Sequence, residues 1–255
     1  MYHLLLSPLK LLPKRCISPA CFSTQKERPH IIEVLKIYAK ELEQSHIMEK
    51  MIPRKYTEPY LTSLTSNQRF THNSNHLNSL TYSLGEPIWD LLDRGGKRWR
   101  PVLAMIIAEL YGKPRREVFE LAALTEIIHN GSLIIDDIED DSSVRRDKEC
   151  VHKLYGVDIS INAGNFMYFS PMLNVFNSPN YSQELKMELV KIYLEETVQL
   201  HIGQAWDIAW HNIDKLKEEY PQESHYLQMT AQKTGVLARL AARMSCAYVG
   251  ASFSE

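Results

Sequence analysis

The 255-residue chain is long enough for one large domain with a substantial core, and its 44% hydrophobic and 24% charged residues are ordinary for a globular protein. A formal net charge of -2 gives no bulk signal for binding nucleic acid or an anionic membrane surface. No apolar run approaches the roughly 18 residues that span a bilayer, so we expect no transmembrane segment. The four cysteines show neither zinc spacing nor the density of a disulfide scaffold, and a reducing compartment fits them.

Residues 1–30 differ in composition from the rest of the chain. They contain four basic residues before the first acidic one, Glu27, and several leucines interrupted by Pro8 and Lys10. Such a composition is typical of an organellar transit peptide. We therefore predict a mitochondrial presequence ending between about Cys21 and His30, and location in the matrix. The alternative is a disordered tail of chance composition on a cytoplasmic protein.

The next segment, residues 31–82, is predicted to hold one helix and an irregular connection. Residues 31–48 place apolar side chains at helical spacing. Residues 49–80 are polar and contain Pro53 and Pro59, which favour a loop.

The remaining residues, 83–255, have a helical pattern with short interruptions. Three stretches are apolar nearly all round, as in helices enclosed by others: residues 102–110, 118–135 and 236–249. Strand alternation is not convincing anywhere. The sequence therefore predicts a single all-α domain, an antiparallel helical bundle around a central cavity.

A cluster of carboxylates follows the second of these apolar stretches. Asp136, Asp137 and Asp140 form a DDxxD pattern, and residues four apart share a helix face. Grouped carboxylates repel one another unless a cation compensates them, and hard oxygen ligands suit Mg²⁺. Arg145 and Arg146 follow, and guanidinium groups bind phosphate oxygens in a bidentate manner. The pattern favours a magnesium-diphosphate site over a merely solvated acidic helix end.

A second, basic cluster lies upstream in the sequence GGKRWRP, residues 95–101. Glycines allow a ligand close to the backbone. At the start of a helix, Lys97 and Arg100 would share a face near the positive end of the helix dipole. The alternative is an ordinary helix start with basic surface residues.

Taken in order, GGKRWRP, IIHN, DDIEDDSSVRRD, GQAWD (203–207) and KTG (233–235) resemble the motifs of trans-prenyl diphosphate synthases of the polyprenyl or geranylgeranyl type. The resemblance runs from about residue 83 to the C-terminus and implies the isoprenoid synthase fold. A terpene cyclase also uses DDxxD, but would not account for GGKRWRP or the arginine pair. A nucleic-acid binder would need a basic face, whereas these basic residues alternate with aspartates.

The resemblance implies a role for each matched residue. The group that would bind isopentenyl diphosphate is Lys97, Arg100, His129 and Arg146. The group that would bind the allylic diphosphate is Arg145, Gln204, Lys233 and Thr234. The metal ligands would be Asp136, Asp137 and Asp140, and the residues closest to the chemistry would be Asp136, Asp140 and Lys233. Gln204 and Asp207 are three apart and should face the same cavity.

The implied reaction is a Mg²⁺-dependent head-to-tail condensation. The allylic diphosphate ionises, the double bond of isopentenyl diphosphate attacks the cation, and the released diphosphate removes a proton. Gly131 and Ser132 precede Asp136 by about one turn, and such small side chains would leave the tunnel open to products of twenty carbons or longer. The resemblance also implies a homodimer, or a heterodimer with a related subunit.

The chain departs from the family pattern in two places. Asp147 stands where a glycine usually follows the arginine pair, and the chain ends at Glu255, before the second aspartate-rich motif and the C-terminal helices that the resemblance implies. Three interpretations remain open: a truncated piece of a working synthase, a non-catalytic partner subunit that binds diphosphate without turnover, or an enzyme that borrows ligands from a partner subunit.

Overall fold

The computed structural model describes residues 31–64, 76–216 and 219–251, and the predicted presequence lies outside them. The described residues form helices joined by short turns, with one small hairpin. In chain order the elements are α1 (Ile31–Gln44), α2 (Ile47–Met51), α3 (Glu58–Leu64), α4 (Leu77–Leu80), η4 (Thr81–Gly85), α5 (Glu86–Asp93), α6 (Trp99–Leu110), η5 (Arg115–Val118), α7 (Phe119–Glu139), β1 (Val144–Arg145), β2 (Lys148–Glu149), α8 (Val151–Tyr155), α9 (Val157–Asn177), α10 (Gln183–His211), α11 (Ile213–Leu216), α12 (Glu223–Thr230), η6 (Ala231–Gly235) and α13 (Val236–Val249).

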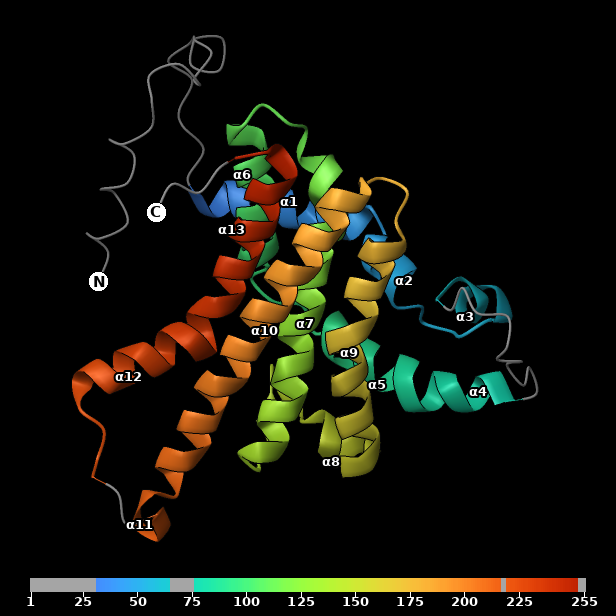
Figure 1. Ribbon diagram of the computed structural model, residues 1–255. Helices are drawn as coiled ribbons and strands as arrows, with labels where there is room; N and C mark the ends of the chain where they lie inside the picture. The colour runs from blue at the N-terminus through green and yellow to red at the C-terminus, as the bar shows by residue number, and fades with distance from the viewer. Residues whose placement is uncertain (1–30, 65–75, 217–218, 252–255) are drawn as a thin grey trace.

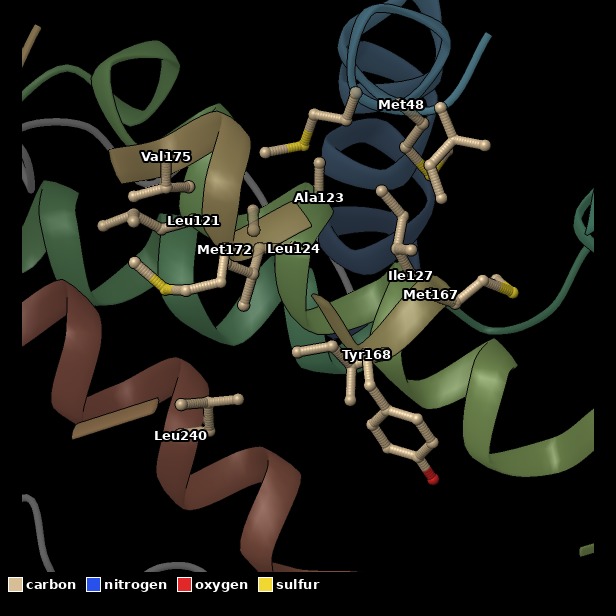
Figure 2. Close-up of a cluster of buried hydrophobic side chains, with 14 of the residues drawn as sticks. Met48, Leu121, Ala123, Leu124, Ile127, Met167, Tyr168, Met172, Val175 and Leu240 are labelled. Atoms are coloured by element: carbon tan, nitrogen blue, oxygen red, sulfur yellow. The ribbon is translucent and has the colours of Figure 1, made fainter. Parts of the chain in front are cut away.

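Helix α7 lies at the centre of the bundle, packed against α6, α9 and α13, while α10 packs against α9 and α13 (Figure 1). This placement explains why residues 118–135 are apolar all round: Leu121, Leu124, Ile127 and Ile128 are each at most 1% exposed. Burial of such a side chain contributes about 1.5–3 kcal/mol. Figure 2 shows the cluster that they form with side chains of α9 and α13. The predicted all-α bundle is confirmed.

The structure corrects the prediction of an irregular connection over residues 49–80. The described part of this segment contains α3, α4 and the end of α2. Pro59 is the second residue of α3, where its missing N–H costs no helical hydrogen bond, so it does not break that helix. The prediction that no strand occurs is also wrong in one place, because β1 and β2 form a two-stranded antiparallel hairpin.

Two glycines allow α7 and α9 to approach closely. A Cβ on Gly131 would lie 2.8 Å from the Cβ of Met167, and a Cβ on Gly164 would lie 2.8 Å from Cδ1 of Ile135. Real side chains do not tolerate such distances. Gly131 therefore belongs to the contact between the two helices.

One described helical stretch, Arg115–Glu139, is long and apolar enough to cross a membrane by length and composition. It includes α7, and 67% of its most apolar window is buried within the bundle. The apolar character is accounted for by packing in the core, so the finding is weak evidence for a membrane span. The expectation of no transmembrane segment is not overturned by it.

Candidate functional site

A cavity of about 210 Å³ lies among α6, α7, α9, α10 and the η6–α13 segment. Six of the residues predicted for the site line it: Arg100, His129, Asp136, Gln204, Lys233 and Thr234. They come from four segments that are far apart in the sequence. The other predicted residues lie outside its lining: Lys97, Asp137, Asp140, Arg145 and Arg146.

On the acidic side of the cavity, Asp136 is held by two residues from other helices. Its Oδ1 accepts a hydrogen bond of 3.1 Å from Nε2 of Gln204 and lies 3.0 Å from Nζ of Lys233. Lys233 also contacts Oδ2 of Asp207 at 2.5 Å. Burial alone would lower the pKa of Lys233, but its hydrogen bonds to Asp207 and Asp136 raise it above the usual value. Lys233 is therefore a fixed cation beside the carboxylates.

Glu139, one turn after Asp136, belongs to the same group of polar side chains. It accepts a 2.7 Å hydrogen bond from Gln204, which thereby bridges two carboxylates. Burial raises the pKa of Glu139, and the nearby charge of Asp136 adds to this effect against the hydrogen bond from Gln204. Glu139 and Asp136 thus share one amide donor at the end of α7.

Lys233 and Thr234 lie in η6, a single π-helical turn between α12 and α13. Such turns are frequent at functional sites because they change which side chains face a cavity. Here Gly203 of α10 allows η6 to approach. A Cβ on Gly203 would lie 2.5 Å from the backbone N of Lys233, so this glycine sets how deeply Lys233 reaches into the site.

Asp137 has a different environment from Asp136 and Asp140. Its side chain is 1% exposed, and its Oδ1 accepts bonds of 2.9 Å and 2.5 Å from Arg145. Asp140 is exposed at the end of α7. The predicted trio therefore does not converge on one point, and no group of three or more metal-ligating side chains is found within the described ranges. Arg145 also lies 3.4 Å from Oδ2 of Asp136.

The hairpin separates the two neighbouring arginines. Arg145 is in β1, whereas Arg146 and Asp147 form the turn, with φ values of 54° and 62°. A two-residue hairpin turn of type I′ needs two such left-handed residues, and glycine adopts this conformation without steric cost. This geometry explains why a glycine would suit position 147. Arg146 points to the GGKRWRP loop: it donates to the carbonyl of Leu91 at 3.2 Å and covers Gly96.

In the basic loop, the expectation that Lys97 and Arg100 share a helix face is wrong. Helix α6 begins only at Trp99, and Arg98 before it has a left-handed φ of 48°. Lys97 is exposed in the preceding turn. Arg98 is 4% exposed and pairs with Glu126 of α7 at 2.5 Å, which fixes the loop on the bundle.

Arg100 and His129 form the basic side of the cavity. Nη1 of Arg100 lies 3.3 Å from Nε2 of His129. Burial, followed by the charges of Arg100 and Arg146, lowers the pKa of His129 to about 3, so the imidazole is neutral at physiological pH. Burial also lowers the pKa of both arginines. Neither arginine forms an ion pair with any part of the chain that the structure describes. Two desolvated guanidinium groups without a carboxylate favour a multiply charged anion as ligand.

The cavity has residues that the sequence motifs did not indicate. Tyr168 of α9 and His201 of α10 form part of its lining, with ring centroids 5.3 Å apart. Ser132 lines the cavity as predicted, but Gly131 does not, because it faces α9. No local pattern distinguishes Tyr168 from core residues on the same helix, so only the three-dimensional arrangement could identify it.

Comparison with known protein families matches residues 81–255 to the family described as Polyprenyl synthetase. Geranylgeranyl pyrophosphate synthase of Eremothecium gossypii is 37% identical over 163 residues, which cover 63% of this chain and 49% of that protein. The chain spans about half the length of the curated relatives it matches.

Solved structures have the same arrangement of helices. Geranylgeranyl pyrophosphate synthetase from the archaeon Geoglobus acetivorans superimposes with a TM-score of 0.67 and 25% identity, over 89% of this chain and 63% of its own. A crystal structure of geranylgeranyl pyrophosphate synthase gives a TM-score of 0.63 and 27% identity, over 84% of this chain and 56% of its own.

Proposed function

Since the chain belongs to the polyprenyl synthetase family, we propose that the protein joins isopentenyl diphosphate head to tail to an allylic diphosphate, with Mg²⁺, and releases a product of twenty carbons. The relatives named as geranylgeranyl pyrophosphate synthases support this product length. The observation that carries the proposal is the division of one cavity into a basic side, Arg100 and His129, and an acidic side, Asp136 with Lys233.

The basic side binds the diphosphate of isopentenyl diphosphate. Arg100 and Arg146 are partly desolvated cations without a carboxylate partner among the described residues, so a diphosphate restores charge balance there. His129, held neutral, donates or accepts a single hydrogen bond without adding charge. Lys97, exposed beside this group, contributes long-range attraction rather than a fixed contact.

The acidic side suits magnesium because its donors are carboxylate oxygens with room for water and phosphate oxygens. Asp136 and the exposed Asp140 would hold the ion, and Glu139 adds charge one turn after Asp136. Asp137, buried against Arg145, orients that arginine instead. When bound, Mg²⁺ would neutralise the oxygens of the allylic diphosphate as it leaves.

The residues of the chain supply the rest of the electrostatic stabilisation. Hydrogen bonds to Asp207 and Asp136 keep Lys233 protonated. Together with Arg145, this cation stabilises the negative charge that develops on the leaving diphosphate. The hydroxyl of Thr234 lines the same cavity and can donate to a phosphate oxygen. Leu133, Leu200 and Leu237 enclose the hydrocarbon and exclude water from the allylic cation.

A turnover measurement tests this proposal. The full chain is incubated with Mg²⁺, farnesyl diphosphate and labelled isopentenyl diphosphate, and prenyl products are separated by length. Incorporation into a twenty-carbon product, lost in Arg100→Ala, is the expected result. Magnesium-dependent binding of farnesyl diphosphate without incorporation would favour a non-catalytic partner subunit. Absence of both binding and incorporation would overturn the proposal.

We also propose that a second copy of the chain covers the outer face of α9 and α10. Phe169, Leu194 and Val198 are 72%, 55% and 56% exposed on this face, and contiguous apolar surface of this kind marks interaction sites. Light scattering should give twice the mass of the chain. Phe169→Glu together with Val198→Glu should yield monomers, and a wild-type monomer would contradict the proposal.

For location, we propose the mitochondrial matrix, on the composition of residues 1–30 alone. A fluorescent protein fused after His30 should enter mitochondria. Replacing Lys10, Lys14, Arg15, Lys26 and Arg28 by serine should leave the fusion in the cytosol. Cytosolic fluorescence of the unaltered fusion would contradict the assignment.

A further inference from the structure

Arg94, a residue outside the sequence motifs, holds the hairpin that carries the two neighbouring arginines of the site. It follows the last residue of α5, and its side chain is 1% exposed. Its Nη1 donates a hydrogen bond of 2.9 Å to the backbone carbonyl of Arg145, and its Nη2 donates one of 2.6 Å to Asp90. Asp90 lies four residues earlier on α5 and fixes the guanidinium group on its own helix. The other donor of Arg94 is thus directed at the hairpin.

The C-terminal end of α5 also binds two other arginines. Arg146 donates to the carbonyl of Leu91 at 3.2 Å, and Arg98 donates to the carbonyl of Leu92 at 2.8 Å. The last carbonyl groups of a helix carry the negative end of its dipole, so they attract cations. The end of α5 therefore connects the hairpin to the loop before α6, and Arg94 supplies the connection to the strand residue that precedes the turn.

The turn of this hairpin is strained. Arg146 and Asp147 both have left-handed φ values, 54° and 62°, and neither is a glycine. A residue with a Cβ adopts this conformation at a cost in energy, and such conformations persist where surrounding contacts fix them. Arg94 holds the residue directly before the turn, while Arg146 within the turn is bound to Leu91. The bonds between α5 and the hairpin are thus contacts that keep the turn in its strained form.

We propose that Arg94 is a positioning residue, which sets the directions of Arg145 and Arg146 in the diphosphate site by holding the hairpin on α5. In the observed arrangement Arg145 reaches Asp137 and Arg146 lies over Gly96. When the bond from Arg94 is lost, the turn relaxes and both guanidinium groups leave these places. Arg94 does not line the cavity, so its effect on a substrate passes through the hairpin. The inference rests on the proposed function for its substrates.

A second-site variant tests this role. Arg94→Met removes both donors, and calorimetry should show that the affinities for isopentenyl diphosphate and for farnesyl diphosphate with Mg²⁺ each fall about tenfold. Asp147→Gly removes strain from the turn, so adding it to Arg94→Met should restore most of the lost affinity. A change at position 147 cannot replace the ion pair with Asp90, and rescue therefore separates positioning from general destabilisation. Arg54→Met, which frees Asp93 on the same helix, should bind as wild type does.

The hairpin also provides a readout without a substrate, because trypsin cleaves after Arg145, Arg146 and Lys148. Cleavage there, mapped by mass spectrometry, is compared with cleavage after Lys191, which is exposed on α10. This ratio should rise about tenfold in Arg94→Met and fall again when Asp147→Gly is added, whereas global unfolding exposes all four sites. If Arg94→Met does not fold, Arg94→Lys keeps a cation beside Asp90, and its single nitrogen loses the bond to the hairpin.

The two measurements separate failure of the positioning role from failure of the proposed function. An unchanged cleavage ratio, or a loss of affinity that Asp147→Gly does not restore, overturns the positioning role of Arg94. A wild type that binds neither diphosphate rejects the proposed function, and the cleavage ratio then still decides whether Arg94 holds the hairpin.

Discussion

Gly203 on α10 lies directly against the backbone of Lys233, so that a Cβ added to Gly203 would be 2.5 Å from the Lys233 nitrogen. The contact joins α10, which supplies Gln204 and Asp207, to the π turn that supplies Lys233 and Thr234. The hydrogen bonds of Lys233 to Asp136 and Asp207 depend on this approach of two backbones.

Replacement of this glycine should therefore impair stability and binding together. Gly203→Ala should lower the free energy of unfolding by about 1–3 kcal/mol, because α10 and η6 must separate to admit the methyl group. Urea denaturation measures the loss, and calorimetry with farnesyl diphosphate should show weakened binding. Gly235→Ala is the matched control. It has open space around it and a helical φ of -74°, so it should raise stability by about 0.4–1 kcal/mol.

The buried pair of Arg98 and Glu126 should be sensitive to removal of one charge. Both side chains are 3% exposed and 2.5 Å apart. Glu126→Gln leaves the buried guanidinium with only the half-exposed carboxylate of Glu43, 3.5 Å from its Nε, and should cost about 3 kcal/mol of folding free energy. The double variant Arg98→Met, Glu126→Leu should recover much of this loss. Lys153→Met, which removes an exposed cation, should change the denaturation midpoint far less.

The neutral His129 should make folding sensitive to mild acid. Its pKa of about 3 in the folded protein is below the ordinary value near 6.5, so between these values the unfolded chain binds a proton that the folded chain does not. Stability therefore rises with pH across this window and is lost as pH falls below 6.5.

From pH 6.5 to 5, wild type should lose about 2 kcal/mol more unfolding free energy than His129→Gln. Denaturant titrations at the two pH values measure the difference. His46→Gln, at an exposed position, should retain the wild-type pH dependence. Equal slopes for wild type and His129→Gln would show that His129 has the same pKa in the folded and unfolded protein.

Asp136 should govern binding that depends on magnesium. Asp136→Asn keeps the shape of the side chain but removes a charge that Lys233 and the proposed ion share, so the affinity for farnesyl diphosphate in Mg²⁺ should fall by more than about tenfold. Calorimetry with and without EDTA measures this. Asp141→Asn, whose exposed carboxylate pairs with Lys153, is the control and should bind as wild type does. A magnesium effect that persists in Asp136→Asn would place the ion elsewhere.

Some of the fold and site was predictable because it depends on local patterns. The apolar stretch 236–249 coincides with α13, and Asp136 lies in the last turn of α7, which ends one residue before Asp140. The irregular connection over 49–80 was mispredicted because its polar helices are short. Pro59 lies in the first turn of α3, but proline is also common in loops, so the sequence alone favours a loop there.

Other features depend on contacts between distant segments, and local spacing carries no information about them. The start of α6 was expected too early because Arg98 adopts a left-handed conformation, which the buried partner Glu126 stabilises from another helix. Gly131 was placed in the tunnel because it is small. Its size instead serves the close contact with Met167. Likewise, Tyr168 becomes a cavity residue only where α9 crosses α10.

The hairpin turn gives two adjacent arginines different tasks. Arg145 reaches the carboxylates of α7, and Arg146 reaches the glycine loop before α6. Two adjacent residues thus contact two different parts of the structure, the carboxylates at the end of α7 and the segment before α6. Deletion of Asp147 would keep both arginines in the chain but would remove the two-residue turn on which their separation depends.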